Sequence, residues 1–193
     1  GMYNAVQGQG ATAANTRGGE EIFIFGANFG PKGDPVLPSL EYGRRDAAGF
    51  LGSECVVANS FTKIKCLTSP GTGTGHSVQV TVGGQESSIY HGNVSYKPPS
   101  IHYFEPSWET DSSGKRTTRE GGVTTGGEKV IVHGDNFGLA SSNKLDQVTY
   151  GEKGYEYSPC FNTTGAGKFC NCSVTVDHSE FVCSPVEGTG RGH

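Results

Sequence analysis

The sequence has little apolar content and lacks the patterns that predict helices or membrane spans. Hydrophobic residues make up 33% of its 193 positions, and methionine and tryptophan occur once each. No window of about 12 residues repeats apolar side chains at the three- and four-residue spacing of an amphipathic helix. No run of about 18 apolar residues is present, so we expect no membrane insertion in this segment.

Clustered positive charge and catalytic motifs are also missing. The net charge is −4, and only two pairs of basic residues are adjacent, Arg44 with Arg45 and Lys115 with Arg116. A nucleic-acid-binding surface needs many clustered Lys and Arg residues. The sequence contains no GxSxG nucleophile elbow, no HExxH zinc motif and no complete phosphate-binding loop. We therefore expect no catalytic residue, no cofactor and no nucleic-acid partner, and we predict that the protein is not an enzyme.

Glycine, by contrast, is abundant, with 31 residues, and it separates short runs that are typical of strands. Residues 22–25 and 130–132 are β-branched or aromatic, and a pair of glycines lies shortly before each run. Residues 78–82 alternate valine with a polar residue, as a half-buried strand does. Short strands separated by tight turns about every 10 residues predict an all-β fold of the sandwich type.

An internal repeat is the strongest signal in the sequence. Five blocks of the first half recur in the same order in the second half. The first three recur at an offset of 108 residues and the last two at an offset of 117, which places a nine-residue insertion in the second copy. The blocks are residues 18–26 with 126–134, 28–30 with 136–138, 42–43 with 150–151, Cys55 and Cys66 with Cys172 and Cys183, and 71–76 with 188–193.

The order of these blocks resembles the IPT/TIG family of immunoglobulin-like domains. The resemblance rests on the Gly-Gly pair before a strand, the Asn-Phe-Gly triplet after it, the cysteine pair, and the segment 69–76 that leads into alternating valines. It covers nearly the whole chain in two copies. It implies two tandem immunoglobulin-like β-sandwiches, residues 1–97 and 98–193. Domains of this family serve as spacers and interaction modules in cell-surface receptors and adhesion proteins.

Each copy is expected to be incomplete at one chain end. The first lacks the opening strand that the second has near residues 99–104, and the second stops before the strands equivalent to 78–82 and 91–96. Two interpretations stay open. The chain is either a fragment of a longer tandem protein, or a subunit whose open sheet edge is completed by a strand of a neighbouring chain, as in β-strand addition.

The six cysteines are expected to form disulfides. Two cysteine pairs share a separation of 11 residues, which favours one structural bridge in each copy. The remaining two cysteines bracket the insertion, in a loop over residues 152–171. The alternative is a metal site made by the last four cysteines, but the repeat accounts for two of these without a metal. We expect no metal. The predicted bridges are Cys55–Cys66, Cys172–Cys183 and Cys160–Cys170.

Three N-glycosylation sequons are present, at Asn93, Asn162 and Asn171. Asn162 lies inside the cysteine-bracketed insertion, where glycans are readily accommodated. Paired cysteines and sequons together indicate an extracellular or cell-surface protein that carries covalent N-glycans.

These observations predict an extracellular structural or adhesive module. The specific expectation is a glycosylated filament or stalk subunit assembled through strand complementation, with copies of itself or neighbouring repeats as partners. The alternative is a ligand-binding ectodomain module of a cell-surface receptor, with a protein or glycan ligand.

Overall fold

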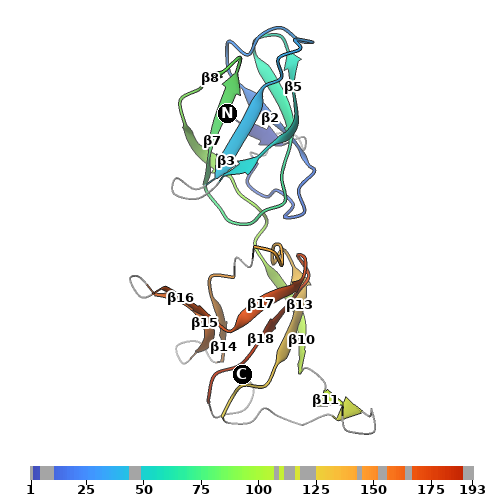
Figure 1. The fold of residues 1–193 in the computed structure, drawn as a ribbon, viewed down its shortest axis with the longest axis vertical. Coiled ribbons are helices and arrows are strands. Elements are labelled where there is room, and N and C mark those ends of the chain that lie inside the picture. The colour runs from blue at the N-terminus through green and yellow to red at the C-terminus, as the bar shows by residue number, and fades with distance from the viewer. Residues whose placement is uncertain are drawn as a thin grey trace. The chain divides into compact units, whose positions relative to one another are not determined.

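The computed structural model describes residues 2–4, 11–43, 49–106, 109–110, 116–117, 125–142, 145–151, 156–163 and 167–188. Every helix or strand in these ranges is a β-strand, and the sheets are antiparallel, which confirms the predicted all-β, immunoglobulin-like fold class. The chain divides into two compact units, Gly1–Pro98 and Pro99–His193 (Figure 1). These described ranges contain no helix of the length and apolarity that a membrane crossing requires.

Unit 1 is a two-layer sandwich. Its strands are β1 (Met2–Asn4), β2 (Glu21–Phe25), β3 (Ser39–Gly43), β4 (Phe50–Leu51), β5 (Ser53–Asn59), β6 (Lys63–Leu67), β7 (His76–Val82), β8 (Gln85–Glu86) and β9 (Tyr90–Val94). One sheet has the order β1-β2-β6-β5, and the other has β4-β3-β7-β8, with β9 also paired to β7. The first sheet matches the ABED sheet of a constant-type immunoglobulin domain, and β3, β7 and β9 correspond to its C, F and G strands, with β4 as an additional short strand beside β3.

Alternate residues along these strands face a shared core. In β2, β3, β6 and β7 the buried side chains recur every second residue, which is the period of a strand with one face toward solvent. The most enclosed side chains are 0–1% exposed, and they come from both sheets: Ile22, Leu40, Tyr42 and Ile64. Burial of each such side chain contributes about 2 kcal/mol to stability. The sandwich therefore rests on a closed core.

The first strand of unit 1 corrects an expectation. The repeat predicted that this copy lacks an opening strand, but β1 pairs with β2 and places Met2 opposite Ile24. In unit 2 the equivalent residue Val132 lies opposite Phe104 in the same way. Strand pairing uses backbone groups, so a three-residue segment fills this place without resembling the Pro-x-Ile sequence of the second copy.

Unit 2 has the same first sheet but a different second one. Its strands are β10 (Ser100–Pro106), β11 (Glu109–Thr110), β12 (Arg116–Thr117), β13 (Val130–Asp135), β14 (Val148–Tyr150), β15 (Tyr157–Thr163), β16 (Gly167–Cys170), β17 (Cys172–Val176) and β18 (Glu180–Cys183). The order β10-β13-β18-β17 repeats β1-β2-β6-β5. The second sheet is β14-β15-β16, and β11 pairs with β12 alone. The predicted loop 152–171 thus contains a hairpin that extends a sheet (Figure 1).

The Asn-Phe-Gly triplet closes one end of each core. Asn28 and Asn136 both have a φ of 65°, a left-handed conformation that asparagine tolerates better than most residues. This turn directs Phe29 and Phe137 into the cores, where they are 8% and 4% exposed. A Cβ on Gly26 would lie 2.5 Å from the Phe29 ring, so the glycine after the strand makes room for the aromatic side chain. The repeated sequence therefore encodes one repeated packing unit.

Candidate functional site

One described disulfide reinforces the first sheet of each unit. Cys55 bonds Cys66 across β5 and β6, and Cys172 bonds Cys183 across β17 and β18. All four cysteines are buried, at 0–6% exposed. Each bridge joins neighbouring strands of one sheet, unlike the inter-sheet bridge of antibody domains. In the part of the chain that the structure describes, no group of three or more His, Cys, Asp or Glu residues is arranged to hold a metal ion.

The structure does not describe the side chains of the third predicted disulfide, Cys160–Cys170, or of the sequon residues Asn93 and Asn162. The backbone places Cys160 opposite Cys170 in the β15–β16 hairpin, and their bridge stays a prediction. Asn93 lies in β9 and Asn162 in β15. Asn171 is described: it is exposed immediately before β17, and its carbonyl accepts a hydrogen bond from the Ser184 N–H at 3.0 Å. Glycosylation of the three sites stays a prediction.

A tyrosine cluster closes the sandwich of unit 1. The Tyr42 and Tyr96 hydroxyls lie 2.8 Å apart, and the Tyr42 oxygen accepts a hydrogen bond from the Ser69 N–H at 2.9 Å. Tyr96 in turn donates to the Ser69 carbonyl at 2.8 Å, while Phe50 and His76 pack edge-on against its ring. Burial raises the pKa of the Tyr96 phenol, and the neighbouring Tyr42 hydroxyl raises it further.

Unit 2 keeps half of this cluster. Tyr150, the equivalent of Tyr42, stacks on Tyr157 with ring centroids 5.4 Å apart. Its hydroxyl donates to the carbonyl of Val186, the equivalent of Ser69, at 3.2 Å. Burial raises the pKa of the Tyr150 phenol. The equivalent of His76 is His193, which lies outside the described residues. In unit 2 the described members of the cluster are therefore Tyr150 and Tyr157.

The second sheets of the two units differ beside this tyrosine. In unit 1, β3 lies between β4 and β7, whereas β14 is the terminal strand of its sheet among the described residues. Leu40 and Tyr42 in β3 are each 1% exposed, but the equivalent Val148 and Tyr150 are only half-buried. The expectation that the second copy stops before its equivalents of residues 78–82 stays a prediction, because residues 189–193 lie outside the described residues. We define Val148, Thr149 and Tyr150 as the β14 edge.

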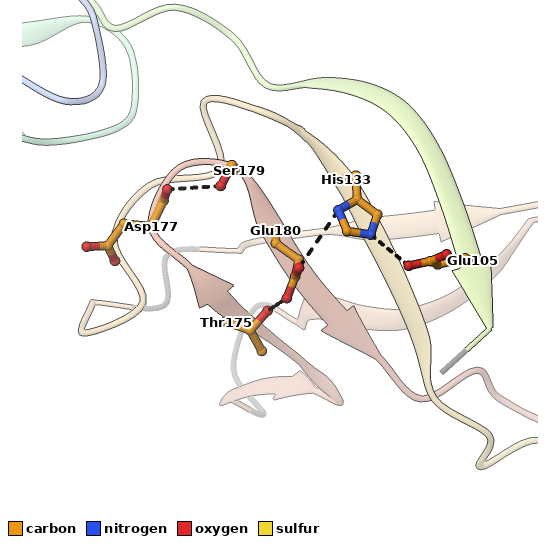
Figure 2. Close-up of polar contacts among 6 residues, drawn as sticks. All are labelled: Glu105, His133, Thr175, Asp177, Ser179 and Glu180. Carbon is orange, nitrogen blue, oxygen red and sulfur yellow. Dashed lines mark hydrogen bonds and ion pairs between the residues drawn. The ribbon is translucent and has the colours of Figure 1, made fainter. Parts of the chain in front are cut away.

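The outer face of the first sheet in unit 2 carries a polar row that the sequence did not indicate. His133 Nε2 lies 3.3 Å from Glu105 and its Nδ1 lies 3.8 Å from Glu180, so one imidazole spans β10, β13 and β18 (Figure 2). Thr175 donates to Glu180 from β17. Tyr103 stacks on the His133 ring at 4.5 Å. No repeat signal could have identified this row, because its unit 1 equivalents are different residue types.

In unit 1 the corresponding face is aromatic and basic. Lys63 places its ammonium 3.9 Å from the centre of the Phe23 ring and 5.3 Å from that of Phe25. Lys65 forms an ion pair with Glu21 at 2.9 Å. The two units thus share the position of this sheet but differ in its outer chemistry.

Unit 1 also contains a shallow cleft of about 220 Å³. Phe25 and Tyr90, which are 44% and 50% exposed, line it together with buried residues of β2 and β7. Ser87 and Ser88 contribute hydroxyl groups. Carboxylates and histidines are not among its lining residues, so this cleft offers apolar contact and hydroxyl groups without an acid–base pair.

A weak structural likeness links this chain to a known extracellular region. No family model matches the chain, and no curated protein matches it. A chain from a structure of the plexin A4 full extracellular region is similar over 94% of this chain, with 16% sequence identity and a TM-score of 0.31. The match spans 12% of the plexin chain. A TM-score this low does not establish a shared fold.

Proposed function

We propose that this chain is an extracellular structural or adhesive module of the IPT/TIG type, and that it assembles with neighbouring molecules through β-strand complementation. The observation that supports the proposal is the sheet that both units repeat, β1-β2-β6-β5 and β10-β13-β18-β17, each with one disulfide between neighbouring strands. An exposed strand edge presents unpaired N–H and C=O groups, which pair with any strand brought beside them.

The extracellular setting is supported by the disulfides. Bridges such as Cys55–Cys66 and Cys172–Cys183 persist in oxidising compartments and are rare in the cytosol. The sequon residue Asn171 is exposed, as an N-glycan requires. Intact-mass measurement of protein secreted from eukaryotic cells tests both features. We expect no free thiol and a mass loss on enzymatic deglycosylation, and free thiols with no glycan mass would contradict the assignment.

Assembly is tested by light scattering and negative-stain electron microscopy across a concentration series. We expect oligomers or filaments that grow with concentration. Val148→Lys places a charge on the inner side of the β14 edge and should shift the protein to monomers. Ser141→Lys, in an exposed turn of the same unit, adds the same charge and should leave assembly unchanged. Monomers at every concentration for the unaltered protein would refute the proposal.

A second candidate is a ligand-binding ectodomain module. The cleft of unit 1 favours it, because Phe25 and Tyr90 present exposed aromatic surface beside two serine hydroxyls. Aromatic faces with nearby hydroxyl groups suit the apolar face of a sugar or a peptide side chain. Screening on a glycan array tests this function, with Phe25→Ala as the variant and Phe61→Ala, another exposed phenylalanine, as the control. Binding that both variants retain equally would contradict a role for the cleft.

A further inference from the structure

The outer faces of the two first sheets carry opposite charges at equivalent positions. In unit 1, Lys63 in β6 lies opposite Phe25 in β2, and its ammonium is 3.9 Å from the centre of the Phe23 ring. In unit 2 the repeat places Glu180 in β18 and His133 in β13 at the same two positions, again opposite each other. A cation beside aromatic rings in one unit is thus replaced by a carboxylate beside an imidazole in the other.

A second position of these faces is reversed in the same way. Glu21, the first residue of β2, forms an ion pair with Lys65 at 2.9 Å. The equivalent of Glu21 is Lys129, which is exposed immediately before β13. The equivalent of Lys65 is the uncharged Val182. The carboxylate at the start of β2 therefore becomes a cation in unit 2, while the cation at the end of β2 becomes a carboxylate.

The unit 2 face is acidic around an exposed aromatic ring. Glu105 and Glu180 lie on the two sides of the His133 imidazole, 3.3 Å from Nε2 and 3.8 Å from Nδ1 (Figure 2). Tyr103, which is 55% exposed, stacks on the same imidazole. The described strands of this sheet, β10, β13, β17 and β18, contain no Lys or Arg. This face therefore presents two carboxylates and apolar surface to a partner.

The unit 1 face has the complementary composition. Phe25 is 44% exposed, and the Lys63 ammonium lies 5.3 Å from the centre of its ring. Lys65 is balanced by Glu21, so Lys63 supplies the net positive charge of the strands β2 and β6. Exposed aromatic side chains are enriched where protein surfaces meet, and opposite charges beside them determine which surfaces pair.

Charge distinguishes the possible pairings of these faces. Two sheets that pack face to face keep their strands roughly aligned, and equivalent sheets packed about an axis parallel to the strands bring equivalent positions to the same level. Two unit 1 faces would place one Lys63 at the level of another, and two unit 2 faces would do the same for Glu180. A unit 1 face against a unit 2 face places Lys63 with Glu180 and Glu21 with Lys129. Like charges therefore disfavour the first two pairings, and opposite charges favour the third.

We propose that the outer face of the first sheet in unit 1 of one molecule binds the outer face of the first sheet in unit 2 of a second copy of this chain. The Lys63 ammonium meets the carboxylates of Glu180 and Glu105, and Phe25 and Tyr103 supply apolar contact. This inference rests on the proposed assembly with neighbouring molecules and adds a contact between sheet faces to strand complementation. Each molecule has one face of each kind, so the contact is heterologous and links copies in series or in a ring.

Charge reversal in the full chain tests the contact, with sedimentation equilibrium as the measurement of self-association. We expect Lys63→Glu and Glu180→Lys, each alone, to weaken self-association about 10-fold, because each variant has only like-charged faces. An equal mixture of the two variants should recover the association of the unaltered protein, because opposite charges then meet at both kinds of contact. Lys32→Glu and Glu187→Lys, at exposed positions outside the strands of these sheets, are the matched controls and should change it less than about 2-fold.

Urea midpoints establish that the variants are folded. Where a reversal lowers the midpoint, Lys63→Gln or Glu180→Gln replaces it, and each should weaken self-association about 3-fold because one attraction is lost without a new repulsion. Recovery on mixing the folded reversal variants, or weakening by the glutamine variants, supports the contact. Folded variants that associate as the unaltered protein does would overturn it, as would folded reversal variants that fail to recover on mixing.

Val148→Lys on the β14 edge separates this inference from strand complementation. Assembly that Val148→Lys abolishes and the charge variants leave unchanged overturns only the contact between faces. Assembly that the charge variants abolish and Val148→Lys leaves unchanged supports this contact and refutes strand complementation. Monomers of the unaltered protein at every concentration overturn both.

Discussion

The two units share the strand order of one sheet and differ in what lies opposite it. In both, a disulfide, an Asn-Phe-Gly turn and a pair of antiparallel inner strands form the same layer. In unit 1 the opposing layer has β7 at its centre, and Ile22 is 0% exposed. In unit 2 the equivalent Val130 is half-buried. The comparison teaches that the same sheet can face different strands, because the described strands opposite it are not the same in the two units.

The largest difference should come from truncating equivalent core residues. Leu40→Ala should lower the free energy of unfolding of unit 1 by about 3 kcal/mol, because the side chain is fully enclosed. Val148→Ala should cost unit 2 about 1 kcal/mol, since its side chain is smaller and half-buried. Hydrogen-exchange mass spectrometry in a urea series measures each unit through its own peptides. Equal losses would mean that the core of unit 2 is already closed.

Removal of the disulfides should affect the two units equally. Each bridge closes a loop with a separation of 11 residues, which restricts the unfolded chain by about 3 kcal/mol. One double variant combines Cys55→Ala with Cys66→Ala, and the other combines Cys172→Ala with Cys183→Ala. The loss of stability is compared between these two double variants. The same exchange measurement applies. A loss in one unit more than twice that in the other would break the structural equivalence of the two bridges.

Alkaline pH should weaken unit 1 through Tyr96. Its pKa is raised above the ordinary value of 10.0 by burial, so the folded state keeps the proton that the unfolded chain releases. The stabilisation is full below about pH 10 and decreases by about 1.4 kcal/mol per pH unit above it, toward the folded pKa. Urea midpoints between pH 8 and 11 measure this slope. Tyr96→Phe should reduce it, and an unchanged slope in that variant would assign the effect to other groups.

The smallest effect should come from the outer face of unit 1. Lys63→Ala removes the ammonium above Phe23 and should cost about 0.5 kcal/mol, as an exposed cation–π contact does. Lys63→Arg keeps a cation over the ring and should cost less. Chemical denaturation at low and high salt measures both variants. If Lys63→Ala lowered the free energy of unfolding by more than about 2 kcal/mol, the contact would behave as a desolvated cation–π pair and not as an exposed one.

Much of the fold was predictable because the repeat carries it. Strands such as β2 and β13 follow from β-branched runs, and the positive φ of Asn28 and Asn136 explains why the triplet recurs. Strand β1 was missed because three residues that contribute mainly backbone bonds leave little pattern. The β15–β16 hairpin was missed because the insertion has no counterpart in the first copy.

The candidate site was predictable only in part. The two disulfides followed from the repeat, since Cys55 and Cys66 recur as Cys172 and Cys183 with the same separation. The polar row around His133 was not predictable, because it depends on which strands become neighbours in space. Glu105 and Glu180 lie 28 and 47 positions from His133, and no local pattern connects such residues.

The disulfides have a mechanical consequence for a module in a stalk. Tension that unfolds unit 1 extends its chain everywhere except between Cys55 and Cys66, where the bridge carries the load directly. The 11-residue separation holds back about 37 Å of contour length at about 3.4 Å per residue. The second unit holds back the same length between Cys172 and Cys183. A stalk of such modules would lengthen in shorter steps under oxidising conditions than under reducing ones, so its extensibility would be set by the redox state of its surroundings.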